Sequence, residues 1–284
     1  ISFGMQDDPN RIGYEWAAHS IYPKRADKQF FRTVVGNKQC LQPYSASIYN
    51  ISAMSYGALS KTDISSLNKG AKLGNFAHNT GEGGISDFHL EGGDLIWQIG
   101  TGYFGCRKED GTFSSELFTE KANFPQVKMI ELKLSQGAKP GKGGVLPASK
   151  ITQAIADIRG LPMGKGVISP AYHSAFSNVP EMMDFIEKIA QETGLPVGFK
   201  SAVGKMEMWV ELADRMLEKG YGPDFITIDG GEGGTGAAPP AFADHVSLPF
   251  VYAFSNVYKV FAERGLTDRI VFAASGKLGF PEST

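Results

Sequence analysis

One glycine-dense stretch constrains the fold of this chain more than any other part of the sequence. Residues 225–229, Phe-Ile-Thr-Ile-Asp, are typical of a short buried strand that ends at an aspartate. Five glycines follow within the seven positions from Gly230 to Gly236. Glycine tolerates φ > 0 and lets a ligand approach main-chain N–H groups closely. A strand that opens into such a loop favours a phosphate or a flat aromatic cofactor as ligand, and the alternative is a wide flexible turn.

Short apolar segments alternate with helical patterns along most of the chain, which predicts a parallel sheet. Seven strands are expected, each ending in polar or glycine-rich residues, at 46–54, 76–80, 127–134, 166–170, 196–201, 225–229 and 270–274. Residues 94–104 are interpreted as an extra strand pair or excursion. Helices are expected from Ser60, at about 148–159, and at 180–193, 206–219 and 249–264.

Polar residues at the carboxyl end of every strand are typical of a (β/α)8 TIM barrel, which builds its active site there. The rival, a doubly wound open sheet, usually carries G-x-G-x-x-G after its first strand, and residues 54–57 match that pattern poorly. We expect residues 1–45 to form an N-terminal extension packed on a barrel made by residues 46–284. One strand–helix unit is missing, so the barrel is expected to be truncated before its eighth strand, with that unit beyond residue 284 or replaced by a partner.

Composition narrows the function. The net charge is −2, which argues against nucleic acid or a membrane surface as partner. Cys40 and Cys106, the two cysteines, are too few for a disulfide framework, a zinc site or an iron–sulfur cluster. Their scarcity suits a reducing compartment, and the cytoplasm is expected. No membrane span or signal peptide is evident, although the sequence leaves open an anchor upstream of Ile1.

Charged side chains near the strand ends form a candidate site. Lys133 and Lys200 are expected to point inward, where a cation needs an anionic or electron-rich partner such as a reduced flavin ring. The alternative is plain ion pairing with Glu131 or Asp229. Glu82 lies between glycines and is interpreted as a base, a substrate contact or a solvated loop residue. His173 follows Ser-Pro and could polarise a carbonyl or cap a turn, and no metal-binding pattern occurs.

Several blocks of sequence resemble the FMN-binding domain of glutamate synthases, in the same order, from about residue 46 to residue 278. The blocks are AMSYGA at 53–58, NTGEGG at 79–84, KLSQGAKPG at 133–141, ISP at 168–170, DGG at 229–231 and GTGA at 234–237. Residues 1–45 and 94–107 look more like the stand-alone glutamate-synthase-like proteins of bacteria and archaea. The resemblance implies a (β/α)8 barrel that binds FMN at its mouth and reduces 2-iminoglutarate, formed from 2-oxoglutarate and ammonia, to glutamate.

The resemblance also implies roles for individual residues. The expected FMN contacts are Ala53, Met54, Ser55, Thr80, Gln136, Lys200, Gly230, Gly231, Gly234, Thr235, Ser275 and Gly276. The expected catalytic residues are Glu82, Lys133 and Lys139. Glu82, Lys139 and Arg159 match positions that handle the oxo acid, and His173 joins them as a candidate substrate contact. An electron-donor protein is an expected partner, and the sequence indicates no oligomeric state.

Three departures from the family pattern put the substrate in question. Val145 stands where the family has a glutamine that contacts 2-oxoglutarate, and Ile85 stands where it has a second glutamate. The eighth strand and the three cysteines of the family's iron–sulfur cluster would follow residue 284. Two alternatives therefore stay open: a non-catalytic binding or scaffold protein that kept the barrel, and a flavin barrel that oxidises a 2-hydroxy acid. The second is ranked last, because the sixth strand ends without a histidine–arginine pair.

Overall fold

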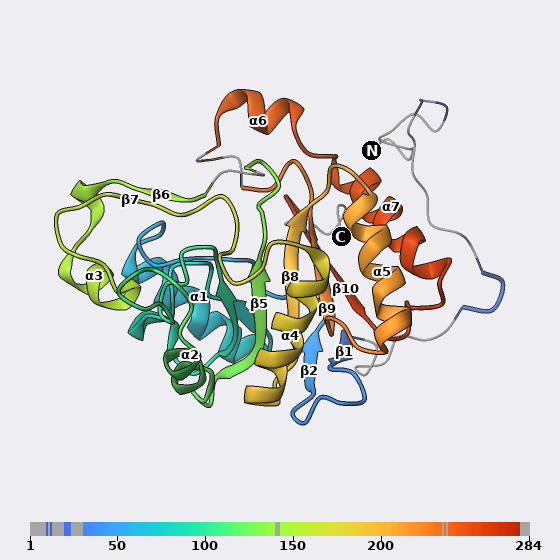
Figure 1. Ribbon diagram of the computed structural model, residues 1–284, viewed down its shortest axis with the longest axis horizontal. Helices are drawn as coiled ribbons and strands as arrows, with labels where there is room; N and C mark the ends of the chain where they lie inside the picture. Colours follow the sequence, from blue (N-terminus) through green and yellow to red (C-terminus); the bar gives the residue numbers. More distant parts are fainter. Residues whose placement is uncertain are drawn as a thin grey trace, which may run out of the picture.

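The computed structural model describes residues 10, 12, 20–23, 31–139, 143–234, 236 and 238–278. At its centre a parallel sheet of six strands curls into a half-barrel (Figure 1), with the strand order β10-β9-β8-β5-β4-β3. The strands are β3 (Ala77–Asn79), β4 (Asp94–Ile99), β5 (Val127–Lys133), β8 (Val197–Ala202), β9 (Phe225–Asp229) and β10 (Val271–Ser275). The predicted α/β barrel, incomplete on one side, is confirmed.

A seventh segment runs along the β3 edge of this sheet. Ile51 forms a parallel bridge with His78, and Met54 N donates a hydrogen bond to Asn79 O at 3.1 Å. The segment corresponds to the carboxyl end of the strand expected at 46–54. It places residues 53–55 at the same end of the half-barrel as the loops that follow the other strands.

Two strand predictions were wrong, and the errors offset each other in the count. Residues 94–104, expected as an extra strand pair or excursion outside the seven strands, contain one strand of the main sheet, β4, which pairs with both β3 and β5. Residues 166–170, expected as the fourth strand, supply only β7 (Val167–Ile168), which pairs antiparallel with β6 (Val145–Leu146) outside the main sheet. Pro170 has no N–H to donate to a ladder, so the short apolar run before it could not continue as a central strand.

Four of the α-helices begin at a residue whose side chain caps the first turn. Ser60 and Asp63 form a capping box at the start of α1 (Lys61–Gly74), and the Asn178 side chain caps α4 (Val179–Thr193). Thr152 caps a new start, so the helix expected at 148–159 is divided into η3 (Ala148–Lys150) and α3 (Gln153–Arg159). The remaining helices are η2 (Asp87–His89), α2 (Ser115–Ala122), α5 (Glu207–Lys219), α6 (Pro240–His245) and α7 (Phe250–Ala262).

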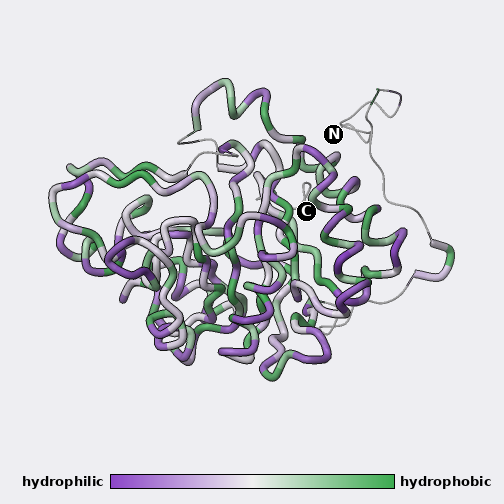
Figure 2. The backbone as a smooth tube through the Cα atoms, viewed as in Figure 1, coloured by the Kyte–Doolittle hydropathy of each residue, from purple (hydrophilic) through white to green (hydrophobic). Residues whose placement is uncertain are grey.

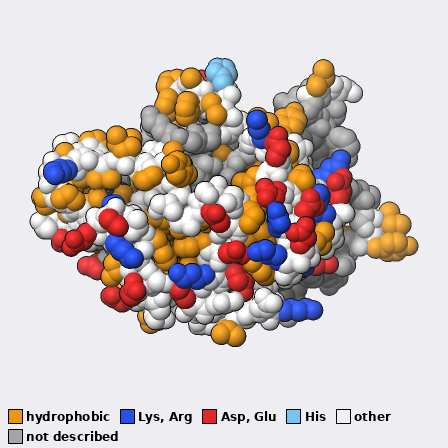
Figure 3. Space-filling model, viewed as in Figure 1, with side chains coloured by type: hydrophobic (Ala, Val, Ile, Leu, Met, Phe, Trp, Pro, Cys, Tyr) orange, Lys and Arg blue, Asp and Glu red, His pale blue; other side chains and the backbone are white. Residues whose placement is uncertain are grey.

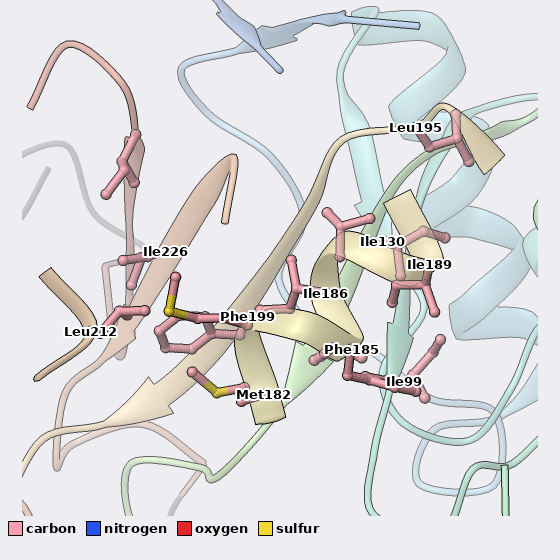
Figure 4. Close-up of a cluster of buried hydrophobic side chains, with 14 of the residues drawn as sticks. Ile99, Ile130, Met182, Phe185, Ile186, Ile189, Leu195, Phe199, Leu212 and Ile226 are labelled. Atoms are coloured by element: carbon pink, nitrogen blue, oxygen red, sulfur yellow. The ribbon is translucent and has the colours of Figure 1, made fainter. Parts of the chain in front are cut away.

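The main core lies between the sheet and the helices on its outer face. Met182, Phe185, Ile186 and Ile189 of α4 point toward apolar side chains of the strands, such as Phe199 (Figure 4). Apolar stretches of the chain run through the central strands (Figure 2). Acidic and basic side chains are interspersed on the outer faces of the helices (Figure 3), where ion pairs such as Lys219–Asp184 at 2.9 Å form.

A second core closes the amino end of the half-barrel. The antiparallel hairpin of β1 (Arg32–Val35) and β2 (Tyr44–Ser47) packs there. Its buried residues Val35, Tyr44 and Ala46 cluster with Ala77, Met129 and Phe225 of the sheet. Asp224 ties this hairpin to the strands, because its carboxylate accepts hydrogen bonds from Asn37 N at 2.6 Å and Val197 N at 2.9 Å. The hairpin therefore covers the end of the barrel opposite the polar strand ends.

We predict that Asp224→Ala lowers the free energy of unfolding by about 2–4 kcal/mol, because the buried N–H of Val197 and the partly buried N–H of Asn37 lose their acceptor. Urea denaturation followed by circular dichroism measures the change. Asp268→Ala removes an exposed aspartate; it is the matched control and should change stability little. An equal effect of the two substitutions would contradict the proposed tie between hairpin and barrel.

Candidate active site

A buried ion pair lies at the carboxyl end of the sheet. Lys133, the last residue of β5, donates through Nζ to Glu82 Oε1 at 2.8 Å, and the two side chains are 11% and 20% exposed. Lys133 Nζ also donates to Gln136 Oε1 at 3.0 Å, and Gln136 Nε2 donates to Gly234 O at 2.8 Å. One chain of polar contacts thus connects the loops that follow β3, β5 and β9. The structure brings together these four residues, all of them predicted for the site.

Glycine backbone presses on Glu82 from two sides. A Cβ atom on Gly100 would lie 2.5 Å from Glu82 Oε2, and one on Gly144 would lie 3.0 Å from Glu82 Oε1. Larger residues at these positions would push the carboxylate away from Lys133. The glycines after β4 and before β6 therefore limit where the Glu82 carboxylate can lie.

The mouth carries more positive than negative charge. Lys200 of β8 stands next to Lys133 in the sheet register and is 6% exposed. Burial alone would raise the pKa of Glu82, but Lys133, with Lys200 and Lys139 beyond it, holds that pKa below its usual value. Burial, together with the like charges of Lys200 and Lys139, lowers the pKa of Lys133 although Glu82 opposes the shift. One ionised carboxylate is therefore shared among three lysines.

The Lys200 ammonium has no hydrogen-bond or ion-pair partner among the residues that the structure describes, although the backbone carbonyl of Lys200 accepts from Leu134 N at 2.9 Å. A buried, unneutralised ammonium is costly unless an anion or an electron-rich group is brought to it. The residues at the mouth thus fit a ligand that carries or develops negative charge. A small pocket beside Lys133 is lined by Glu82, Thr101, Leu134, Ser135, Gln136, Lys139, Gly143, Gly144, Pro170 and Ala171.

The glycine-rich loop after β9 is packed against the protein itself. Cβ atoms would lie 2.5 Å from Phe250 Cβ at Gly230, 2.5 Å from Asp229 Oδ1 at Gly233 and 1.7 Å from Gln136 Nε2 at Gly234. The N–H groups of Gly230, Gly231 and Gly233 already donate to the carbonyls of Ser275, Leu248 and Gly230. These glycines permit close packing, so the expectation that their N–H groups meet a ligand does not hold for these three. Thr235 lies outside the described residues.

Asp229 fastens this loop to its neighbours. Its Oδ2 accepts from Gly137 N and its Oδ1 from Ser275 Oγ, each at 2.8 Å. Gly276, with φ 117°, follows Ser275 and packs against the backbone of Gly230. Asp229 thus pairs with neutral donors, and the alternative in which it neutralises a lysine is not what the structure shows.

Glu131 is a buried residue whose role was missed. Its Oε1 accepts from Asn79 Nδ2 and Gln98 Nε2, and its Oε2 accepts from Thr227 Oγ1, each at 2.7 Å. Asn79 Oδ1 in turn accepts from Gly81 N at 3.0 Å, at the start of the loop that carries Glu82. The available signal was a carboxylate between the apolar residues Ile130 and Leu132 of β5, and the sequence had suggested only a lysine partner for it.

His173 faces inward with both ring nitrogens engaged. Nδ1 lies 3.1 Å from Tyr103 Oη, and Nε2 lies 2.9 Å from Lys133 O. Since Lys133 O can only accept, Nε2 carries the hydrogen. Burial lowers the pKa of His173 to about 4, so the ring is neutral near pH 7. The side chain is 2% exposed and holds the backbone of Lys133.

Arg159 lies behind the pocket. It is 7% exposed, donates through Nη2 to Tyr56 O at 3.0 Å, and stacks over the Phe104 ring at 5.1 Å. Burial lowers its pKa, and the charge of Glu82 opposes that shift. Its guanidinium approaches the glycine loop after β3, because a Cβ on Gly83 would lie 2.9 Å from Nη2. The structure does not bring Arg159 into the pocket that Lys133 and Lys139 line.

The first and second strand ends meet directly. A Cβ on Gly81 would lie 2.8 Å from Ser55 N, so residues 53–55 lie against the loop after β3. Thr80 is buried, and its hydroxyl donates to Gly81 O while accepting from Gln98 N. Ile85 packs into the main core, whereas Val145 of β6 is 56% exposed.

The described residues contain neither a metal-binding cluster nor a membrane-spanning helix. No cluster of three or more His, Cys, Asp or Glu side chains is arranged to hold a metal ion in that part of the chain. None of its helices is long and apolar enough to cross a membrane.

Comparison of the sequence with known proteins matches it to one family. The family model described as "Conserved region in glutamate synthase" matches residues 26–282. The "Glutamate synthase large subunit-like protein YerD" of Bacillus subtilis is 46% identical over 252 residues, which are 88% of this chain and 48% of that protein.

Two more distant relatives extend the match. The "Archaeal-type glutamate synthase [NADPH]" of Thermotoga maritima is 35% identical over 79% of this chain and 41% of its own length. The "Archaeal glutamate synthase [NADPH]" of Methanocaldococcus jannaschii is 31% identical over 94% and 49%. The chain thus spans about half the length of the curated relatives it matches.

The stability of the fold is expected to fall as the pH is lowered from about 6.5 to about 4. Burial lowers the pKa of His78 and of His173 to about 4. The unfolded chain takes up these protons near pH 6.5, so it binds more protons than the folded chain within this window. Each histidine then contributes a slope of about 1.4 kcal/mol per pH unit, which urea denaturation at several pH values measures. His173→Gln should remove about one histidine's share of the slope, and an unchanged slope would contradict the assignment.

Proposed function

Because this chain belongs to the glutamate synthase family, we propose that it forms the FMN-binding part of a cytoplasmic oxidoreductase that reduces an imino or 2-oxo acid to an amino acid. In the family that substrate is 2-iminoglutarate, formed from 2-oxoglutarate and ammonia. The observation that carries the proposal is the buried Glu82–Lys133 pair beside the unpartnered Lys200 at the mouth of the half-barrel. The division into an extension, 1–45, and a barrel, 46–284, belongs to the same proposal.

The residues at the mouth suit FMN, which when bound supplies hydride transfer to and from its ring. Lys200 would stabilise negative charge on the reduced ring, because no described residue neutralises it. Residues 53–55, Thr80, Gln136 and the loop of Gly230, Gly231, Gly234 and Thr235 would contact the cofactor. Ser275 and Gly276 would begin the phosphate site, since barrels hold phosphate in the loops after their last strands.

The substrate side of the mouth is assigned to charged residues of the pocket. Glu82, kept ionised by its lysine neighbours, would face the nitrogen of an imino or ammonium group. Lys133 and Lys139 would attract the carboxylate of the substrate, and Arg159 would do so after a turn of its side chain toward the pocket. His173 would act by holding Lys133, because both of its ring nitrogens are engaged within the protein.

Hydride transfer to a substrate requires a source of electrons. Two of the relatives carry NADPH in their names, which makes NADPH the first reductant to test. The iron–sulfur cluster of the family needs three cysteines, whereas this chain has Cys40 and Cys106, and Cys106 is fully buried. An electron-donor protein or a further part of a longer protein would then deliver electrons to this barrel.

We predict that the full-length protein is yellow, absorbs at roughly 450 nm and releases FMN on denaturation. The absorbance should bleach when NADPH or dithionite is added under anaerobic conditions. Steady-state assays with 2-oxoglutarate and ammonium, set against other 2-oxo acids, then identify the substrate. A full-length protein that neither contains nor takes up FMN would overturn the proposal and favour a scaffold role.

Lys200→Ala is expected to weaken FMN binding by roughly 10- to 100-fold, the loss of a charge-assisted contact worth about 1.5–3 kcal/mol. It should also lower the reduction potential of the flavin, since a fixed positive charge beside the reduced ring is removed. Fluorescence titration and redox titration measure the two effects. Lys205→Ala, at an exposed lysine just after β8, is the control and should leave both values unchanged. Unchanged affinity and potential in Lys200→Ala would remove this residue from the site.

A further inference from the structure

We propose that His89 is a positioning residue that holds the backbone carbonyl of Met54, and through it residues 53–55, at the mouth of the half-barrel. The inference rests on the proposed function, in which this segment lies against the cofactor. His89 is the last residue of η2 and is fully buried. No resemblance or sequence pattern singled it out, since its partners, the backbone of Met54 and Thr80 and the N–H and hydroxyl groups of Ser86, lie on different segments of the chain.

The hydrogen bonds of the ring fix its tautomer. Nε2 lies 3.0 Å from Met54 O, a group that can only accept, so Nε2 carries the hydrogen and donates it. Nδ1 lies 3.2 Å from Ser86 N, a group that can only donate, so Nδ1 is the acceptor. The Ser86 hydroxyl, 2.8 Å from Nδ1, adds a second contact on the same side. A neutral ring therefore bridges the start of η2 and the first strand end.

The ring has little freedom to change its charge. A proton added to Nδ1 would face the Ser86 N–H, which cannot turn round to accept it. Burial also lowers the pKa of His89, and the ring of His78 lies only 5.2 Å away between centroids. His89 is therefore a fixed donor to Met54 O, not a group that exchanges protons with a substrate.

The Met54 carbonyl lies between two parts of this segment that are held by other contacts. On the sheet side, Ile51 and Met54 N complete the ladder with Ala77 and Asn79. Within the described part of the chain, the Met54 carbonyl receives a hydrogen bond from His89 alone. Immediately afterwards the chain turns, with Leu59 N donating to Ser55 O at 3.0 Å. The direction of the Met54 carbonyl thus decides how residues 53–55 enter the mouth.

Two substitutions separate the two halves of the bridge. His89→Gln can place its amide nitrogen where Nε2 lies, so it keeps the donor to Met54 O and loses the acceptor for Ser86 N. His89→Asn can place its amide oxygen where Nδ1 lies, so it keeps the Ser86 contact and loses the Met54 contact. Both are buried amides of similar polarity, which makes each a control for the other.

The experiment combines FMN titration with hydrogen–deuterium exchange of residues 51–58 in full-length wild-type protein and both variants. We expect His89→Asn to bind FMN about 10-fold more weakly and to exchange faster over 51–58, while His89→Gln stays within about 3-fold of wild type. Equal behaviour of the two variants, whether both intact or both impaired, would overturn the inference.

Two further readings keep the outcomes distinct. Wild-type protein that binds no FMN would refute the proposed function, and the exchange comparison would still decide whether His89 holds the segment. Should either variant fail to fold, the ¹⁵N spectrum of the wild-type histidines decides instead. A neutral ring protonated at Nε2 supports the inference for His89, and a ring protonated at Nδ1 overturns it.

Discussion

The side chain of Glu131 is the interaction on which the rest of the barrel mouth depends. Its two carboxylate oxygens accept hydrogen bonds from Asn79 of β3, Gln98 of β4 and Thr227 of β9. In the sheet order, β3 and β9 each lie two strands away from β5, on opposite sides. The curl of the sheet lets one carboxylate collect donors from both directions. This polar side chain is tolerated in the core because three uncharged side chains donate hydrogen bonds to its two oxygens.

Contacts spread from this residue to the charged groups above it. The Asn79 side chain donates to Glu131 and accepts from Gly81 N. It thereby positions the start of the loop that carries Glu82. Lys133 lies two residues beyond Glu131 on the same strand and meets that Glu82. The neutral network thus positions both members of the ion pair, while Asp229 and His173 secure the loops around it. Hydrogen bonds from uncharged side chains therefore fix the positions of the residues below the mouth. The three lysines near Glu82 determine the charge of the mouth itself.

Much of this architecture could be predicted from the sequence, because alternating apolar strands and helices leave few folds to choose from. Since parallel strands end at one edge, Glu82, Lys133, Lys200 and Gln136 could also be expected to converge. Both errors came from judging a segment by its local pattern. Residues 94–104 contain several glycines and looked like an extra strand pair or excursion, whereas residues 166–170 looked like a central strand although they end at Pro170. Glu131, His89 and Tyr103 escaped notice because their roles depend on partners 30 or more residues away in the chain, such as Thr227 and Met54.

Ile85 and Val145, the two residues that depart from the family pattern, lie in different surroundings. Ile85 is turned into the main core, where an apolar side chain contributes to packing and a carboxylate would be costly. Val145 is largely exposed on β6, and the two glycines just before it, Gly143 and Gly144, line the pocket. Neither residue brings a charge to the mouth, so its polarity is determined by Glu82 and the three lysines. A net positive mouth favours negative charge on a bound molecule.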